Sequence, residues 1–435
     1  MKKNLSIYYL LLLGVLSIWN SPELPPMIFR LAYLVLAIAP IVYSNIKLFP
    51  CVLSTLVIIS ANRHAPSFMP FLPSYLAITT ILALFFKKYK SGVRASTGLL
   101  VFMLFTLLVD LLWSSSVESI SITSLIALLF FLFVDSDVDS RCRELSISFV
   151  VISLFLCIEA LIFRNEFTHS LSVGDADFNR VGWNDPNYFT AVIGMGAMAG
   201  LNLLLSSDKM SKLTRFVLFG VIMLVIVVAL MVASRGGIVA LFLSGFALLV
   251  LTRRRSRKSS GVVLLLGVFV AVLYVMGAFD FLLSRFVNDE GMIGGRRIIW
   301  LSKLEDFSAQ ASFSDWLFGI GHKKGMALSS YVGSRNYIGF HNDFLAILVS
   351  YGIIGLLMVA GLLLFPIFKY RSPFVTAGCL YIIIISMSLE PLYSGALDVF
   401  YFYFYICILG ESALKRAKTE RELEYSLDTQ HHSHV

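Results

Sequence analysis

A histidine–asparagine pair, His341–Asn342, stands at the start of a long apolar segment that contains Gly352 and Gly355. Imidazole titrates near neutral pH, so His341 can take a proton from a reacting hydroxyl or, once protonated, hold an anion. A lone histidine at a helix start more often caps or packs. The asparagine, the two glycines one helical turn apart and the polar stretch 280–340 before them favour a chemical role for His341.

Arginines that could hold an anion occur in two further places. Arg235 lies in a Ser-Arg-Gly-Gly sequence between two apolar segments, and a charge facing lipid at the bilayer centre costs about 2.5–3.5 kcal/mol. The glycines predict a tight turn with exposed backbone N–H groups, which would suit an anion, although snorkelling to lipid headgroups is an alternative for Arg235. Arg296 and Arg297 follow a glycine pair and open an amphipathic pattern that suits either phosphate oxygens or anionic lipid.

Amide and aromatic side chains cluster before another apolar segment. The Asn-Asp-Pro-Asn sequence at 184–187 predicts a helix start. Arg180 and Trp183 lie just before it, and these side chain types could also line a sugar site together with Asn184 and Asn187. Both interpretations, a helix cap and a sugar contact, stay open from these residues alone.

Several classes of chemistry lack their sequence patterns. The chain has no P-loop and no dinucleotide fingerprint, so we predict neither an ATP-driven pump nor a cofactor. No outward Asp-x-Asp or Glu/His cluster predicts a catalytic metal, and the five cysteines have no metal-ligand spacing. Acidic residues are scarce within the apolar segments, which disfavours proton- or cation-coupled transport.

Membrane helices must position these residues. Of 435 residues, 58% are hydrophobic and 14% charged, with a mean hydropathy of +0.83, whereas soluble proteins have about 25% charged residues. We predict an all-α polytopic membrane protein with about 12–14 transmembrane helices. The apolar segments are 5–19, 27–45, 47–60, 71–86, 97–113, 119–134, 145–163, 187–206, 216–233, 237–252, 261–279, 342–368, 374–389 and 397–412.

The basic residues predict an orientation. They concentrate in one alternating set of loops, of which 253–258 is the most basic, and such loops face the cytoplasm. Both termini are therefore expected in the cytoplasm and the large 280–340 loop outside. We expect one transmembrane domain over 1–412 and a cytoplasmic tail over 413–435. The net charge of +8 is then a topology signal rather than a sign of nucleic-acid binding.

These motifs together resemble those of the O-antigen ligase and O-antigen polymerase superfamily of bacterial envelope glycosyltransferases. Residues 341–355 resemble its His-Asn…Gly-x-x-Gly signature, and 234–237 resemble its Ser-Arg-Gly turn between two spans. An arginine and a tryptophan four residues apart in 296–300, followed by the turn at 319–321, resemble its loop pattern. Residues 184–187 resemble its Asn-Pro-Asn element, and the order along the chain also agrees.

The resemblance covers roughly 180–365 and implies a metal-independent, inverting glycosyltransferase of GT-C-like helical architecture in the bacterial inner membrane. Its donor would be a saccharide on undecaprenyl pyrophosphate, and its reaction would occur at the periplasmic face. Membrane lipid and the lipid-linked oligosaccharide are the implied partners, and a chain-length regulator protein is a further one.

The resemblance also implies roles for the candidate residues. His341 would be the general base, or alternatively a pyrophosphate ligand. Arg235 and Arg296 would stabilise the leaving pyrophosphate. The expected substrate contacts are Arg180, Asn184, Asn187, Arg285, Arg297, Trp300 and Asn342.

Three functional classes remain open. The His-Asn-Asp-Phe-Leu…Tyr-Gly-Ile-Ile-Gly version of the signature and the modest 280–340 loop favour a polymerase of lipid-linked repeat units over a ligase that uses lipid A-core. A flippase or exporter of lipid-linked oligosaccharide would also need many spans and cationic cavities, but it would form no glycosidic bond. A membrane scaffold would leave arginines at the outer interface unexplained.

Overall fold

Apolar helices make up most of the structure, a computed structural model that shows an all-α polytopic membrane protein as predicted. The residues that it describes are 97–114, 138–164, 168–173, 176–181, 186–206, 210–253, 259–280, 282–284, 296–328, 331–332, 335–336, 339–389, 404 and 407–408. This part of the chain contains four helices long and apolar enough to cross a membrane. The predicted spans before residue 97 and at 119–134 lie outside the described residues.

The apolar helices coincide with the segments predicted from hydropathy. The four long ones are α9 (Pro186–Ser206), α10 (Lys212–Val232), α11 (Arg235–Arg253) and α17 (Asp343–Tyr370). The shorter ones are α6 (Thr97–Val109) with the π-helical η3 (Asp110–Ser114), α8 (Val138–Ile162), α12 (Ser259–Val275) and α18 (Pro373–Ser386). Without water in the bilayer core, such runs satisfy their backbone polar groups only as helices.

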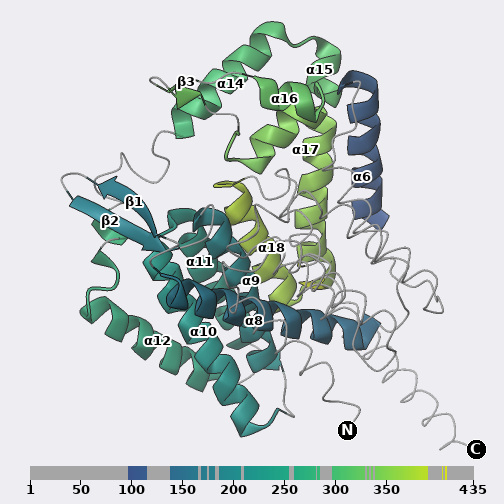
Figure 1. The fold of residues 1–435 in the computed structure, drawn as a ribbon. Helices are drawn as coiled ribbons and strands as arrows, with labels where there is room; N and C mark the ends of the chain where they lie inside the picture. Colours follow the sequence, from purple (N-terminus) through teal and green to yellow (C-terminus); the bar gives the residue numbers. More distant parts are fainter. Residues whose placement is uncertain are drawn as a thin grey trace, which may run out of the picture.

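Helix α9 lies at the centre of the bundle, where it packs against α8, α10, α11 and α18 (Figure 1). Two interhelical hydrogen bonds pair buried hydroxyls with its carbonyl groups. Tyr381 of α18 donates its hydroxyl proton to the Ala191 carbonyl at 2.6 Å, and Ser153 of α8 donates to the Ile193 carbonyl at 3.1 Å. A buried hydroxyl without a partner would be costly, so these bonds fix the register of both neighbours on α9.

Three short helices form a separate layer at one end of the bundle: α14 (Arg296–Gln310), α15 (Phe313–Phe318) and α16 (His322–Ala327). They gather beside α17, at the top of Figure 1. Phe307 of α14 and Trp316 of α15 meet edge to face, with ring centroids 5.0 Å apart. We call this layer, 296–328, the loop helices; it belongs to the 280–340 region that was expected to lie outside the bilayer.

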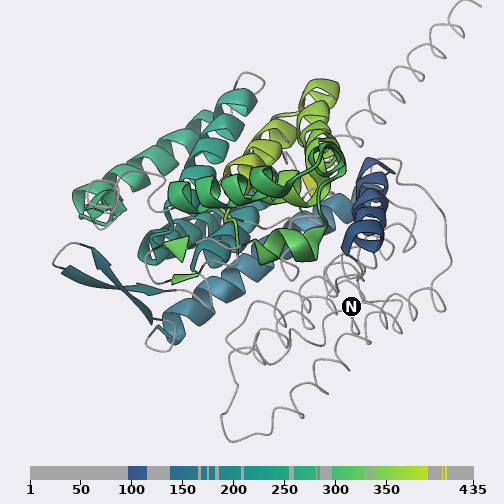
Figure 2. The same cartoon turned by 90° about the horizontal axis from the view of Figure 1, so that it is seen from above.

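Two small antiparallel hairpins add strands that the all-helical prediction did not contain. Strand β1 (Thr168–Val173) pairs with β2 (Ala176–Val181), and β3 (Tyr331–Val332) pairs with β4 (Arg335–Asn336). Figures 1 and 2 both place the first hairpin on the side of the molecule opposite α6. The Gly-Asp dipeptide between β1 and β2 is a sequence pattern typical of a two-residue hairpin turn.

Helix α17 is broken at Gly352, where the backbone has φ 68° and ψ −171°. The expectation that Gly352 and Gly355 stack one regular turn apart is therefore wrong. Gly352 adopts a conformation that side chains other than hydrogen disfavour strongly. Gly355 instead packs close to Phe105 of α6. The two glycines thus have different roles in one motif.

The loop helices enter this break with their backbone. The N–H groups of Ile320 and Gly321 donate to the carbonyls of Val349 and Ser350 at 3.1 and 2.9 Å. A broken helix leaves carbonyl groups without their usual partners, and the turn after α15 supplies donors for two of them. Contact is so close that a Cβ atom at Gly319 would lie 2.2 Å from the Ser350 carbonyl. The Gly-Ile-Gly turn and the glycine of the span therefore form one joint.

Asp110, which is fully buried in η3, fastens this joint from a third direction. Its Oδ1 accepts the backbone N–H of His322 at 2.8 Å, and its Oδ2 accepts the Tyr351 hydroxyl at 3.3 Å. These bonds tie α6 and η3 to α16 and α17. Burial lowers the pKa of His322 to about 4, so its imidazole is neutral at pH 7.

Candidate functional site

The Asn-Asp-Pro-Asn and Ser-Arg-Gly-Gly motifs meet at one end of the bundle. The hydroxyl of Ser234 donates to Oδ1 of Asn187 at 2.9 Å. Ser234 also accepts the N–H of Gly237 at 3.4 Å, so it caps the first turn of α11. Ala233, with φ 52°, ends α10, and Arg235 is the first residue of α11. Arg235 is half-buried and directly follows the Ser234–Asn187 contact.

The two glycines after Arg235 have a different role from the predicted one. They do not form an exposed turn, because they lie within the first turn of α11. A Cβ atom at Gly236 would lie 2.2 Å from Oγ of Ser388, and one at Gly237 would lie 2.5 Å from Thr190. Glycine is needed here so that α11 can approach α9 and the end of α18.

The His-Asn motif rests on that same end of α18. Asn342 caps α17 by accepting the Leu345 N–H at 3.2 Å, and its Nδ2 donates to the Met387 carbonyl at 3.4 Å. The backbone N–H of Asp343 donates to the Leu389 carbonyl at 3.1 Å. Segment 387–389 is therefore contacted by the start of α17 on one side and, through Ser388, by the start of α11 on the other.

His341 itself has a left-handed backbone, with φ 52°, and is half-buried. Histidine adopts this region more readily than most residues, but the conformation still costs free energy, on the order of 1–2 kcal/mol. Such residues cluster at functional sites when the surroundings hold them in place. Phe340, which precedes His341, is fully buried and supplies part of that support.

Helix α14 connects the arginine pair to this turn. The indole N–H of Trp300 donates to the Phe340 carbonyl at 2.8 Å. Arg296 begins α14 one turn before Trp300 and is half-buried, and residues four apart share one face of a helix. Arg297 is exposed. The contacts thus bring Arg235, Arg296 and His341, which are far apart in sequence, to the same end of the bundle.

The remaining sequence candidates fall in the hairpin before α9 or outside the described residues. Arg180 is in β2, opposite His169 of β1, and β2 lies against α10. Asn184 and Arg285 fall outside the described residues. The substrate roles predicted for Arg180, Asn184 and Arg285 remain predictions, as do those of the residues gathered around His341.

Lys303 is a buried residue of this region that sequence reasoning missed. It is fully buried in α14. The sequence carries a signal for it, because Lys303 lies at helical spacing between Ile299 and Phe307, which form the buried face of α14. This spacing distinguishes Lys303 from the basic residues that precede it.

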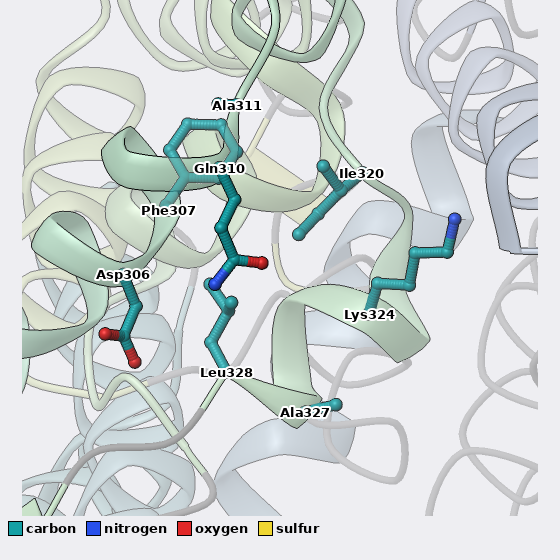
Figure 3. A pocket seen from close by; sticks show the side chains of 8 residues that line it. All are labelled: Asp306, Phe307, Gln310, Ala311, Ile320, Lys324, Ala327 and Leu328. Carbon is teal, nitrogen blue, oxygen red and sulfur yellow. The ribbon is translucent and has the colours of Figure 1, made fainter.

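A cavity of about 420 Å³ lies between α14 and α16 (Figure 3). Its walls are formed by Asp306, Phe307, Gln310, Ala311, Ile320, Lys324, Ala327 and Leu328. Figure 3 shows the Gln310 amide directed into it, whereas the ends of Asp306 and Lys324 point away. With no arginine in its wall, this cavity is distinct from the arginine and histidine arrangement and offers little to a pyrophosphate.

No cluster of three or more His, Cys, Asp and Glu side chains suited to a metal occurs in the described part of the chain. Among the described residues at this end, the guanidinium groups of Arg235 and Arg296 and the imidazole of His341 could interact with an anion. Guanidinium forms paired hydrogen bonds with phosphate oxygens. The arrangement therefore combines two candidate anion ligands with one candidate base.

Residues 218–360 match the family model described as O-antigen ligase. This match confirms the resemblance to the O-antigen polymerase and ligase superfamily, and it spans Arg235, Arg296 and His341. Comparison of the chain with curated proteins gives no match. The matched segment runs from α10 through the loop helices into α17, which is the part of the chain that carries the candidate site.

Proposed function

We propose that this membrane protein, related over 218–360 to O-antigen ligases, is a polymerase of envelope polysaccharide. It would join undecaprenyl-pyrophosphate-linked repeat units at the periplasmic face of the inner membrane, with inversion and without a metal. The observation that supports the proposal is that Arg235, Arg296 and His341 lie at the same end of the bundle. Segment 387–389 contacts the starts of both α11 and α17, and Trp300 of α14 contacts Phe340.

The proposed reaction is a single displacement. The acceptor hydroxyl oxygen bonds to the anomeric carbon of the donor, and the bond from that carbon to the pyrophosphate oxygen breaks. The hydroxyl proton passes to the imidazole of His341, since a neutral sugar hydroxyl is a poor nucleophile. Negative charge grows on the departing lipid pyrophosphate, where Arg235 and Arg296 would stabilise it. Attack from the opposite face inverts the anomeric carbon.

Orientation is part of the proposal. The positive-inside bias supports cytoplasmic termini, a single transmembrane domain over 1–412 and a cytoplasmic tail over 413–435. It also supports a periplasmic position for the loop helices. A membrane-impermeant thiol reagent added to whole cells, once it has passed the outer membrane, should label Ser314→Cys and leave Lys212→Cys unlabelled, since both positions are exposed. The opposite labelling pattern would show that the loop helices face the cytoplasm.

Deletion of the protein separates the polymerase from its alternatives. In a strain lacking it, surface polysaccharide resolved on a gel should consist of single repeats on lipid A-core, and the ladder should return with the wild-type protein. Full-length polymer stranded on undecaprenyl pyrophosphate would instead identify a ligase. Lipid-linked single units trapped on the cytoplasmic side would identify an exporter. A chain-length regulator as partner is proposed from the superfamily resemblance, and its removal should broaden the ladder.

A further inference from the structure

Lys303 is held in the interior of the loop helices by two contacts. Its Nζ donates to the Leu328 carbonyl at 2.5 Å and lies 4.8 Å from the centroid of the Phe340 ring. Lysine is rarely fully buried, because the ammonium group loses its hydration and needs compensating contacts. A carbonyl oxygen and an aromatic face both provide such compensation. The Leu328 carbonyl and the Phe340 ring therefore stabilise the ammonium group of Lys303 in its buried position.

Helix α14 contacts Phe340 through a second residue. Trp300, three residues before Lys303, donates its indole N–H to the Phe340 carbonyl at 2.8 Å. Phe340 is thus contacted twice by α14: Trp300 bonds to its backbone carbonyl, and Lys303 lies over its ring. Phe340 directly precedes His341, whose left-handed backbone requires support from its surroundings.

We propose that Lys303 is a positioning residue for His341: through the Phe340 ring and the Leu328 carbonyl, it fixes the turn that presents the imidazole. The catalytic part of this inference rests on the proposed function, whereas the structural part does not. A base must lie within hydrogen-bond reach of the proton that it removes, so a turn that drifts slows turnover more than it weakens substrate binding.

Modification of His341 by diethyl pyrocarbonate tests the structural part without any assay of activity. The full-length protein in detergent would be labelled over time, and each histidine peptide would be quantified by mass spectrometry. Lys303→Met keeps the length of the side chain but removes its charge and its donor. We expect the labelling rate of His341 to rise about threefold or more, as for a locally opened turn, while buried His322 stays unreactive.

Lys324→Met is the matched control, since Lys324 is an exposed lysine of the neighbouring α16. It should leave the labelling of both histidines unchanged. Turnover adds a second measurement. Lys303→Met should lower kcat about tenfold or more with little change in KM, the pattern of a lost transition-state alignment, and Trp300→Phe should act in the same direction. Because both residues hold one turn, the double variant should lose less than the two single losses combined.

Unchanged His341 labelling in both Lys303→Met and Trp300→Phe would overturn the proposal. If Lys303→Met also makes His322 reactive, the loop helices have opened and Phe340→Leu decides instead. That variant removes the ring and leaves the bond from Lys303 to Leu328 in place. Faster labelling of His341 alone would support the proposal, and unchanged labelling would refute it. Failure of the proposed function would appear separately, as a normal polymer ladder in a strain that lacks the protein.

Discussion

Replacement of Arg235 by alanine is expected to lower the rate of polymer formation by about 10²–10³-fold, the usual effect of removing one group that stabilises a developing anion. Arg235 begins α11 beside the Ser234–Asn187 contact, so the change removes a guanidinium from an anchored position. Initial rates with purified protein and a lipid-linked repeat unit measure the effect. Arg235→Lys should recover only part of the rate, because lysine keeps the charge but loses the paired hydrogen bonds.

Lys212→Ala is the control for this measurement. Lys212 is exposed at the opposite end of α10, so its loss should leave the rate unchanged. If folded Arg235→Ala protein has the wild-type rate, Arg235 has no part in the mechanism.

Replacement of His341 by glutamine tests the proposed base. If His341 is the base, the fall in rate at acidic pH should disappear in the variant. An acidic limb that persists would exclude His341 as the base, whereas a fall in rate at basic pH that disappears in the variant would identify it as a cationic pyrophosphate ligand.

Gly352→Ala is expected to destabilise the protein by about 3 kcal/mol or more, because two penalties coincide. The backbone at Gly352 has a positive φ of 68°, and an added Cβ atom would lie 2.2 Å from the carbonyl oxygen of Leu317. Either the break in α17 or the end of α15 must move. The thermal midpoint in detergent, followed by the loss of the folded species on size-exclusion chromatography, measures the change.

Gly361→Ala in the same helix is the matched control. A Cβ atom at Gly361 would meet nothing within 4 Å, and its backbone is not among the positive-φ glycines. Alanine forms helix better than glycine by about 1 kcal/mol, so the control should be neutral or slightly more stable. A Gly352→Ala variant as stable as this control would contradict the close joint between the loop helices and α17.

Most of the helical architecture could be predicted because lipid imposes it. Apolar runs in a membrane protein must be helical, and hydropathy alone located α9, α10, α11 and α17. The break at Gly352 could not be seen in this way, since the apolar pattern continues on both sides of it. Its cause is a tertiary contact with the loop helices, and a regular hydropathy pattern carries no information about such contacts.

The candidate site was predictable in its parts but not in its assembly. The types of Arg235, Arg296 and His341 suggested their chemistry, and their motifs follow one another in a recognisable order. Nothing in the sequence around 387–389 indicated that this segment would lie between the starts of α11 and α17. Asp110 was likewise overlooked, although an acidic residue in an apolar helix is a standard signal of a buried polar role.

Helix α9 is the most buried of the four long helices, since 83% of its apolar window is buried inside the protein. Bilayer thickness acts on helices that expose apolar surface, and α12 exposes Leu264 and Val268. Asn187 lies in the first turn of α9 and holds Ser234 next to Arg235. The contact that holds Ser234 next to Arg235 is therefore made by the most buried of these helices. A change in bilayer thickness is expected to change the tilt of the outer helices more than that of α9.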